Sequence, residues 1–304
     1  MAGSGFGTNF RITTWGETHG AGVGVVVDGC PAGLPLERED VQKYLDRRKP
    51  GQSKYTTQRK EGDQVEILSG IFEGRTTGTP ISMVVYNKDQ RSKDYSNIKD
   101  IYRPGHADFT FDMKYGFRDY RGGGRSSGRE TIGRVAAGAV AAKVLKELGI
   151  EIKAYAKAIA GIEVSKDHFD FAEMNNNPFN MPDKEAAKLV QEKADQMIKE
   201  MDSIGGIIEC QIKGMPVGIG ETVFDKLDAE LSKAIMSIGS VKGFEIGDGF
   251  EAANLRGSEN NDDFICVDGK VEKETNHSGG VLGGMSDGSA IVFRAAIKPT
   301  PSIA

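Results

Sequence analysis

Glycine clustering is the feature of this sequence that most constrains its fold. The chain has 40 glycines in 304 residues, about 13%, whereas average proteins have roughly 7%. The glycines gather in short groups and do not recur at every third position, which excludes a collagen-like chain. Grouped glycines allow left-handed backbone and the close approach of a ligand. We therefore expect several long functional loops, which favour an α+β fold over a barrel with short connections.

Charge and composition exclude several classes of protein. The net charge is -5 at pH 7, whereas a general nucleic-acid binder usually has a basic balance. Three cysteines, Cys30, Cys210 and Cys266, lack the spacing of a metal site. The first residues form no hydrophobic signal segment, and no run approaches the roughly 18 apolar residues that span a bilayer. We expect a cytoplasmic protein without a metal, a nucleic-acid partner or a membrane partner.

Apolar runs predict the main elements of secondary structure. Strands are expected at residues 23–27, 65–68, 81–85, 207–212 and 290–297. Helical periodicity predicts helices over residues 36–45, 186–201 and 227–238, the second ending at Gly205.

The most specific local pattern is the segment Arg121-Gly-Gly-Gly-Arg-Ser-Ser127, which leads directly into a predicted helix. Ser127 and Glu130 have the spacing of a capping box. An alanine-rich run continues this helix to Leu148, with Gly149 as its expected C-cap. Arginines, hydroxyls and flexible backbone therefore meet at the positive end of a helix dipole, an arrangement suited to phosphate or carboxylate groups.

Three further basic segments occur in this acidic chain, at residues 47–60, 103–106 and 298–302. Arginine and lysine in such positions suit small anionic ligands. Each segment taken alone is also compatible with a solvated surface turn.

Two of the four histidines are candidate acid–base groups. His19 stands in Gly-Glu-Thr-His-Gly and His106 in Arg-Pro-Gly-His, so neighbouring glycines let a ligand approach both. Histidine titrates near neutral pH, which suits proton transfer, although either residue alone could be structural. His168 is expected at the surface. The glycines that follow His277 would let a ligand approach it, but a structural role is favoured there. The four histidines lack the spacing of metal ligands.

Taken together, these motifs resemble the chorismate synthase family. Residues Gly16–Gly20 correspond to the family's Gly-Glu-Ser-His-Gly, with a threonine in place of the serine, and Gly124–Thr131 corresponds to Gly-Arg-Ser-Ser-Ala/Gly-Arg-Glu-Thr. Other segments that resemble the family, in the same order along the whole chain, are Asp46–Ser53, Asp89–Ser96, Arg103–Asp108, Asp119–Gly124, Val241–Phe250, Asn276–Gly284 and Lys298–Ser302.

The resemblance implies a layered α/β sandwich fold, a single domain over residues 1–304 and a homotetramer. It also implies a carbon–oxygen lyase of the shikimate pathway, in aromatic amino-acid biosynthesis. This lyase removes phosphate from 5-enolpyruvylshikimate 3-phosphate (EPSP) by a 1,4-anti-elimination that gives chorismate. The family requires reduced FMN although no net oxidation occurs, and NADPH enters only as a reductant of the flavin.

Residue roles follow from the resemblance. His19 is the implied general acid toward the leaving phosphate, and His106 is implied to stabilise the anionic reduced flavin. The implied substrate-binding residues are Arg48, Lys54, Arg103, Arg129 and Arg134. The implied flavin-binding residues are Arg125, Ser126, Ser127, Gly239, Ser240, Gly283, Lys298, Pro299, Thr300, Pro301 and Ser302.

Family members also carry an Arg-His-Asp-Pro segment, which would follow Ala304. We therefore expect the domain to lack its C-terminal segment here and the native protein to continue. The family's remaining acidic residue and arginine at the flavin would lie in that continuation.

Two other functions remain open. One is an FMN oxidoreductase with net hydride transfer. The other is an RNA-binding protein that uses residues 47–60 and the segment Arg121–Ser127. The acidic net charge and the lack of interleaved aromatic side chains on these segments disfavour RNA binding.

Overall fold

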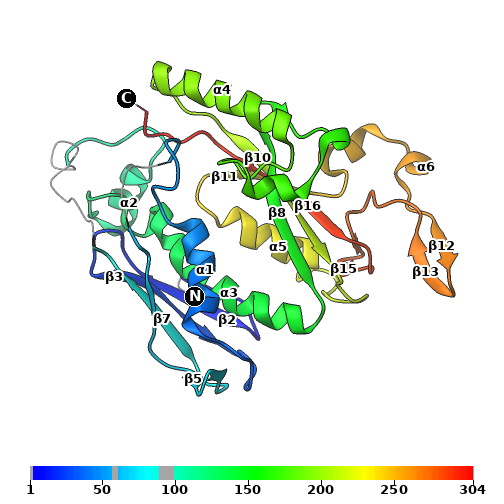
Figure 1. The fold of residues 1–304 in the computed structure, drawn as a ribbon, viewed down its shortest axis with the longest axis horizontal. Helices are drawn as coiled ribbons and strands as arrows, with labels where there is room; N and C mark the ends of the chain where they lie inside the picture. Colours follow the sequence, from blue (N-terminus) through cyan, green and yellow to red (C-terminus); the bar gives the residue numbers. More distant parts are fainter. Residues whose placement is uncertain (1–2, 57–60, 89–98, 304) are drawn as a thin grey trace. The chain divides into compact units, whose positions relative to one another are not determined.

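The structure is a computed structural model that describes residues 3–56, 61–88 and 99–303, and it divides into two compact units, residues 1–147 and 148–304 (Figure 1). The family-like segment Asp89–Ser96, residues 57–60 of one basic segment, and Ala304 lie outside the described residues. Each unit combines antiparallel strands with helices, so the predicted α+β class is confirmed. The single domain stays a prediction.

Unit 1 is built on a five-stranded antiparallel sheet with the order β1-β2-β3-β7-β4. Its strands are β1 (Gly5–Phe6), β2 (Arg11–Gly16), β3 (Gly22–Asp28), β4 (Val65–Ile67) and β7 (Ile81–Tyr86), and a separate hairpin contains β5 (Ile71–Phe72) and β6 (Arg75–Thr76). Its helices are α1 (Arg38–Arg48), α2 (Asp108–Tyr115) and α3 (Thr131–Glu147), the last preceded by the 3-10 turns η2 (Gly124–Ser126) and η3 (Gly128–Glu130).

The core of unit 1 lies between this sheet and the helices α1 and α3, which pack against each other and against the strands (Figure 1). Alternate residues of a strand share one face, and one face of each central strand is buried. The buried side chains of that face are Val23, Val25 and Val27 on β3 and Ile81, Met83 and Val85 on β7, and Val84 on the other face of β7 is buried as well. Burying one such side chain stabilises the fold by about 1.5–3 kcal/mol. The strands predicted at residues 23–27, 65–68 and 81–85 and the helix at 36–45 are confirmed.

The start of α3 differs from the prediction. The α-helix begins at Thr131, and Ser127 caps the preceding turn η3, where its hydroxyl oxygen accepts from Arg129 N at 3.3 Å. The Glu130 carboxylate accepts instead from Thr14 Oγ1 at 2.8 Å and from Arg134 Nε at 2.9 Å. The predicted capping box is wrong, because partners outside the turn compete for Glu130.

Unit 2 contains a second antiparallel sheet with the order β11-β16-β10-β8-β9. Its strands are β8 (Glu151–Ile159), β9 (Ile162–Glu163), β10 (Gly206–Lys213), β11 (Val241–Ile246) and β16 (Ile291–Ile297). Two hairpins pair β12 (Phe264–Val267) with β13 (Lys270–Lys273) and β14 (Val281–Leu282) with β15 (Met285–Ser286). The helices are α4 (Lys184–Glu200), α5 (Leu227–Met236) and α6 (Gly257–Asn260), with the 3-10 turns η4 (Lys166–His168), η5 (Phe171–Asn175) and η6 (Gly249–Asn254).

Most predicted elements of unit 2 are confirmed, namely the strands at residues 207–212 and 290–297 and the helices at 186–201 and 227–238. The end of α4 is different. Met201 takes the left-handed conformation (φ 55°) and closes the helix, so the predicted end at Gly205 is wrong. Strands β8 and β11 were not predicted. Within residues 3–56, 61–88 and 99–303, no helix combines the length and hydropathy of a membrane span.

Candidate functional site

His19 lies in the tight loop that joins β2 to β3 in unit 1. The side chain of Asn87 donates from Nδ2 to the carbonyl oxygens of Glu17 and Gly20, each at 2.9 Å, and so holds the loop on both sides of the histidine. His19 is only 8% exposed. Gly122 covers its ring so closely that a Cβ at this position would lie 2.8 Å from Nε2. The structure thus brings the motif Gly16–Gly20 and the segment Arg121–Ser127 together.

A buried carboxylate, Asp63, joins two of the predicted arginines. Its Oδ1 accepts from Arg129 Nη1 at 3.1 Å, and its Oδ2 accepts from Arg48 Nη1 at 3.0 Å. The Asp63 side chain is 0% exposed. Arg129 also donates from Nε to Asn87 Oδ1 at 3.0 Å, so this network continues to the residue that holds the His19 loop.

Arg48 and Arg129 reach this network from different elements. Arg48 is the last residue of α1, and it also donates from Nε to Thr131 Oγ1 at 3.2 Å and from Nη2 to the Gly128 carbonyl at 2.9 Å. Arg129 belongs to η3. The C-terminal end of α1 is therefore tied to the start of α3.

A second carboxylate, Glu130, holds two more of the predicted arginines. Its Oε2 accepts from Arg134 Nε, and its Oε1 lies 3.7 Å from Arg125 Nη2. Arg125 also donates to the Gly16 carbonyl at 3.0 Å and to Thr14 Oγ1 at 2.6 Å. The guanidinium of Arg125 therefore connects the segment Arg121–Ser127 to β2. The neighbouring Ser126 is exposed, and its hydroxyl donates to the Gly123 carbonyl at 2.7 Å.

Arg103 and His106 lie on a different segment, the turn before α2. Arg103 donates from Nε and Nη2 to the two carboxylate oxygens of Asp108, each at 2.8 Å. These hydrogen bonds lower the pKa of Asp108 from 3.8 to about 2. The His106 backbone N–H donates to the Arg103 carbonyl at 3.2 Å, and the residue is half-buried. Lys54 is exposed after α1, with Nζ 5.0 Å from the centre of the Tyr55 ring.

In unit 2 the structure joins two of the predicted flavin segments. Val241 of β11 pairs with Ile297 of β16, and the Lys298 N–H donates to the Ser240 carbonyl at 2.9 Å. Residues 239–240 and 298–302 therefore lie at one end of the same strand pair.

Gly283 lies apart from these two segments. It stands in the β14–β15 turn, where the neighbouring Gly284 carbonyl accepts from the first residue of α5, Leu227, at 2.8 Å. Ser240 follows the other end of this ten-residue helix, and a helix of that length spans about 15 Å. The structure therefore places Gly283 and Ser240 near opposite ends of α5.

The two remaining histidines have ordinary structural environments. The His168 side chain is 50% exposed, as expected for a surface residue. The His277 side chain is 29% exposed, and its Nδ1 lies 2.7 Å from Asp248 Oδ2. Among the described residues, no group of three or more His, Cys, Asp or Glu side chains is arranged to hold a metal ion.

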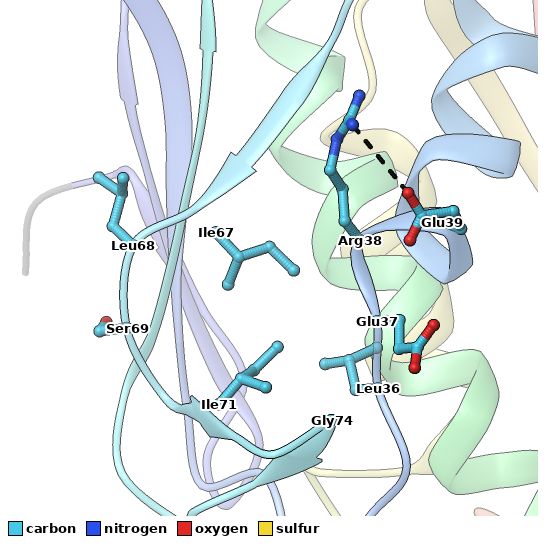
Figure 2. Close-up of a pocket in the computed structure, with 9 residues that line it drawn as sticks. All are labelled: Leu36, Glu37, Arg38, Glu39, Ile67, Leu68, Ser69, Ile71 and Gly74. Atoms are coloured by element: carbon cyan, nitrogen blue, oxygen red, sulfur yellow. Dashed lines mark ion pairs between the residues drawn. The ribbon is translucent and has the colours of Figure 1, made fainter.

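Unit 1 also has a pocket of about 510 Å³ away from the predicted residues. It lies between the start of α1 and the segment from β4 to β6, and Figure 2 shows Leu36, Ile67 and Ile71 facing one another within it, with Glu37 and Arg38 at its edge. No residue with a predicted role in catalysis or binding lines it.

Three residues of the site were missed by sequence reasoning, namely Asp63, Asn87 and Glu130 in its role as an arginine partner. Asp63 precedes a strand, as many loop aspartates do, and Asn87 follows one. Their partners are 15 to 70 positions away in the sequence. No local pattern marks either residue, because their function is defined by long-range contacts.

Comparisons with known proteins agree with the motifs. A family model described as chorismate synthase matches residues 10–304. Chorismate synthase of Lachnospira eligens is 70% identical over 303 residues, and the match covers 100% of this chain and 83% of that protein. Chorismate synthase of Methanococcoides burtonii is 59% identical over 305 residues with the same two coverages. A crystal structure of chorismate synthase matches with a TM-score of 0.81 and 33% identity, over 97% of this chain and 86% of that one.

Proposed function

The chain belongs to the chorismate synthase family of carbon–oxygen lyases, and we propose that it converts EPSP to chorismate and inorganic phosphate. One C–H bond and one C–O bond of the substrate break and the ring gains one C=C bond. The proton released from carbon balances the proton that the phosphate takes up, so the substrate undergoes no net oxidation. The observation that best supports this proposal is the buried His19, which is linked through Asn87 to a cluster of two arginines and one carboxylate. Such a site combines a proton donor with an anion-binding surface.

His19 is the proposed general acid. A phosphate leaves more readily when it takes up a proton, and an imidazolium can donate one near neutral pH. Asn87 fixes the loop on both sides of His19, and the Gly122 backbone packs on the ring. These contacts hold the imidazole in one position and limit its contact with water, which favours directed proton transfer.

The arginines are the proposed anion-binding groups, since EPSP carries a phosphate and two carboxylates. Arg48 and Arg129 are held by Asp63, and Arg134 is held by Glu130. Guanidinium groups that are fixed before the substrate binds recognise carboxylate and phosphate with little loss of side-chain entropy. We assign further contacts to Lys54 and Arg103, of which Arg103 is already paired with Asp108.

Most of the proposed flavin-binding residues belong to unit 2. Ser240 and Lys298–Ser302 combine an ammonium group, hydroxyls and a hydrogen-bonded backbone at one end of β16, and such donors fit a phosphate group. Gly239, Gly283, Pro299, Thr300 and Pro301 complete this set. In unit 1 we assign contacts to Ser126 and Ser127, while Arg125 anchors their segment to β2.

When bound, reduced FMN supplies transient electron density that helps phosphate to leave. His106 is the proposed cationic partner, because a positive charge favours the ionised form of an acidic group. NADPH is proposed only as a reductant of the flavin. We further propose that the protein acts as a homotetramer in the cytoplasm.

An anaerobic assay tests this function. The protein is mixed with EPSP and chemically reduced FMN, and phosphate and chorismate are followed together. We expect equal amounts of the two products without added NADPH. Flavin oxidation in step with product would indicate an oxidoreductase, and a protein that neither binds flavin nor releases phosphate would contradict the proposal.

A further inference from the structure

We propose that Asp63 is a positioning residue that orients Arg48 and Arg129 toward the anionic groups of the substrate and leaves Arg129 Nη2 to donate to one of them. This inference rests on the proposed function, because it concerns the same substrate. It adds a residue to which neither the sequence motifs nor the family resemblance assigns a role.

Two arginines share the Asp63 carboxylate. Each oxygen of Asp63 accepts from a different arginine, at 3.0 and 3.1 Å. Arg103 and Asp108 show the alternative arrangement, in which one arginine occupies both oxygens of one carboxylate. Within the three side chains Arg48, Asp63 and Arg129, two positive charges face one negative charge. An excess positive charge beside a buried carboxylate favours an anion as the third partner.

Arg129 also carries a buried donor that has no acceptor within the part of the chain that the structure describes. The Arg129 side chain is 6% exposed, and its Nε and Nη1 donate to Asn87 and Asp63. Its Nη2 is buried and has no hydrogen-bond partner among the described residues. Buried polar groups nearly always have a partner, so an unpaired guanidinium nitrogen indicates a place for a ligand. The two neighbouring bonds fix the direction of this nitrogen.

Asn87 connects Arg129 to the loop of the proposed acid, His19. Asn87 accepts from Arg129 Nε and donates to the two carbonyls beside His19. The orientation of the arginine and the position of the histidine are thus coupled through one side chain. An anionic group bound at Arg129 Nη2 would contact the same network that holds the proposed proton donor.

The test uses Asp63→Asn, which keeps the shape of the side chain and removes its charge. We expect the KM for EPSP to rise about 10- to 150-fold, the loss typical of a charge-assisted hydrogen bond. The affinity for inorganic phosphate, measured by calorimetry, should weaken in parallel, whereas the affinity for FMN should stay within about twofold. Asp28→Asn is the matched control. Asp28 also pairs with an arginine in unit 1, but the pair is exposed, with side-chain exposures of 61% for Arg11 and 41% for Asp28.

A second variant guards against misfolding. Asn87→Ala removes the partner of Arg129 Nε but no charge, and we expect it to raise the KM for EPSP and lower kcat together because it also releases the His19 loop. A folded Asp63→Asn protein with unchanged KM and phosphate affinity would overturn the proposal. If Asp63→Asn does not fold, an unchanged KM in Asn87→Ala would overturn it instead. A wild-type protein that binds phosphate but does not convert EPSP would count against the proposed function and leave the anion site supported.

Discussion

Gly122→Ala tests the proposed position of His19 by a change outside the histidine itself. An added Cβ would lie 2.8 Å from His19 Nε2 and 2.9 Å from Thr18 Cγ2, about 0.7 Å closer than the roughly 3.5 Å of a favourable contact. Either the ring or the glycine-rich segment must therefore move. A displacement of about 1 Å can cost a rate factor of about 10², so we expect kcat to fall about 10- to 100-fold.

Gly123→Ala provides the matched control. Both glycines have left-handed backbones, with φ of +77° and +84°, and an alanine there costs about 1–2 kcal/mol of stability in each case. At Gly123, however, the added Cβ would meet Ser126 Oγ at an ordinary 3.5 Å. The assay is anaerobic phosphate release from EPSP with reduced FMN, together with thermal unfolding of both variants. Equal kcat values in the two variants would refute the assigned position of His19.

Three further predictions follow from the same structure. His19→Ala should lower kcat by about 10²–10⁴-fold while the FMN affinity measured by flavin titration stays unchanged; near wild-type turnover would remove its role as acid. Asp108→Asn should cost about 1.5–3 kcal/mol of unfolding free energy at pH 7. Its arginine partner lowers the pKa of Asp108 from 3.8 to about 2. The stabilisation is therefore complete above about pH 4 and is lost as the pH falls through about 2. A difference in unfolding free energy between wild type and Asp108→Asn that persists below that pH would contradict this. Finally, a thiol reagent should label exposed Cys266 quickly and the buried Cys30 and Cys210 only after unfolding, since burial raises the pKa of both; rapid labelling of all three would show that the described core is wrong.

Elements whose residues carry their own signal could be predicted from the sequence. The apolar runs at 23–27 and 81–85 are central strands with buried alternate residues, and the alanine-rich run after Ser127 is a helix. Local sequence signals did not predict where a helix ends when another residue could end it first. Met201 ends α4 in a left-handed conformation four residues before the expected glycine, because the backbone N–H of Asp202 already closes the helix on the Met197 carbonyl.

The sequence predicted which types of side chain form the candidate site, but not the contacts between them. Glycine-flanked His19 and the arginines near Ser127 were identified from the motifs, since those residue types suit acid catalysis and anion binding. The carboxylates that hold the arginines were not, because an aspartate such as Asp63 has no local pattern that distinguishes it from a surface residue. Its burial results from α1, η3 and the segment before β4 meeting in the folded unit.

The measurement that tests the central claim most directly is the number of turnovers supported by each reduced flavin. In a sealed anaerobic cuvette, the protein receives EPSP and reduced FMN at a small fraction of the EPSP concentration, while the flavin spectrum, chorismate and phosphate are recorded. For a lyase without net redox chemistry, chorismate and phosphate should both rise to the full amount of EPSP, and the flavin should still be reduced at the end. Product formation that stops at one equivalent per flavin, with the flavin oxidised in step, would contradict the account.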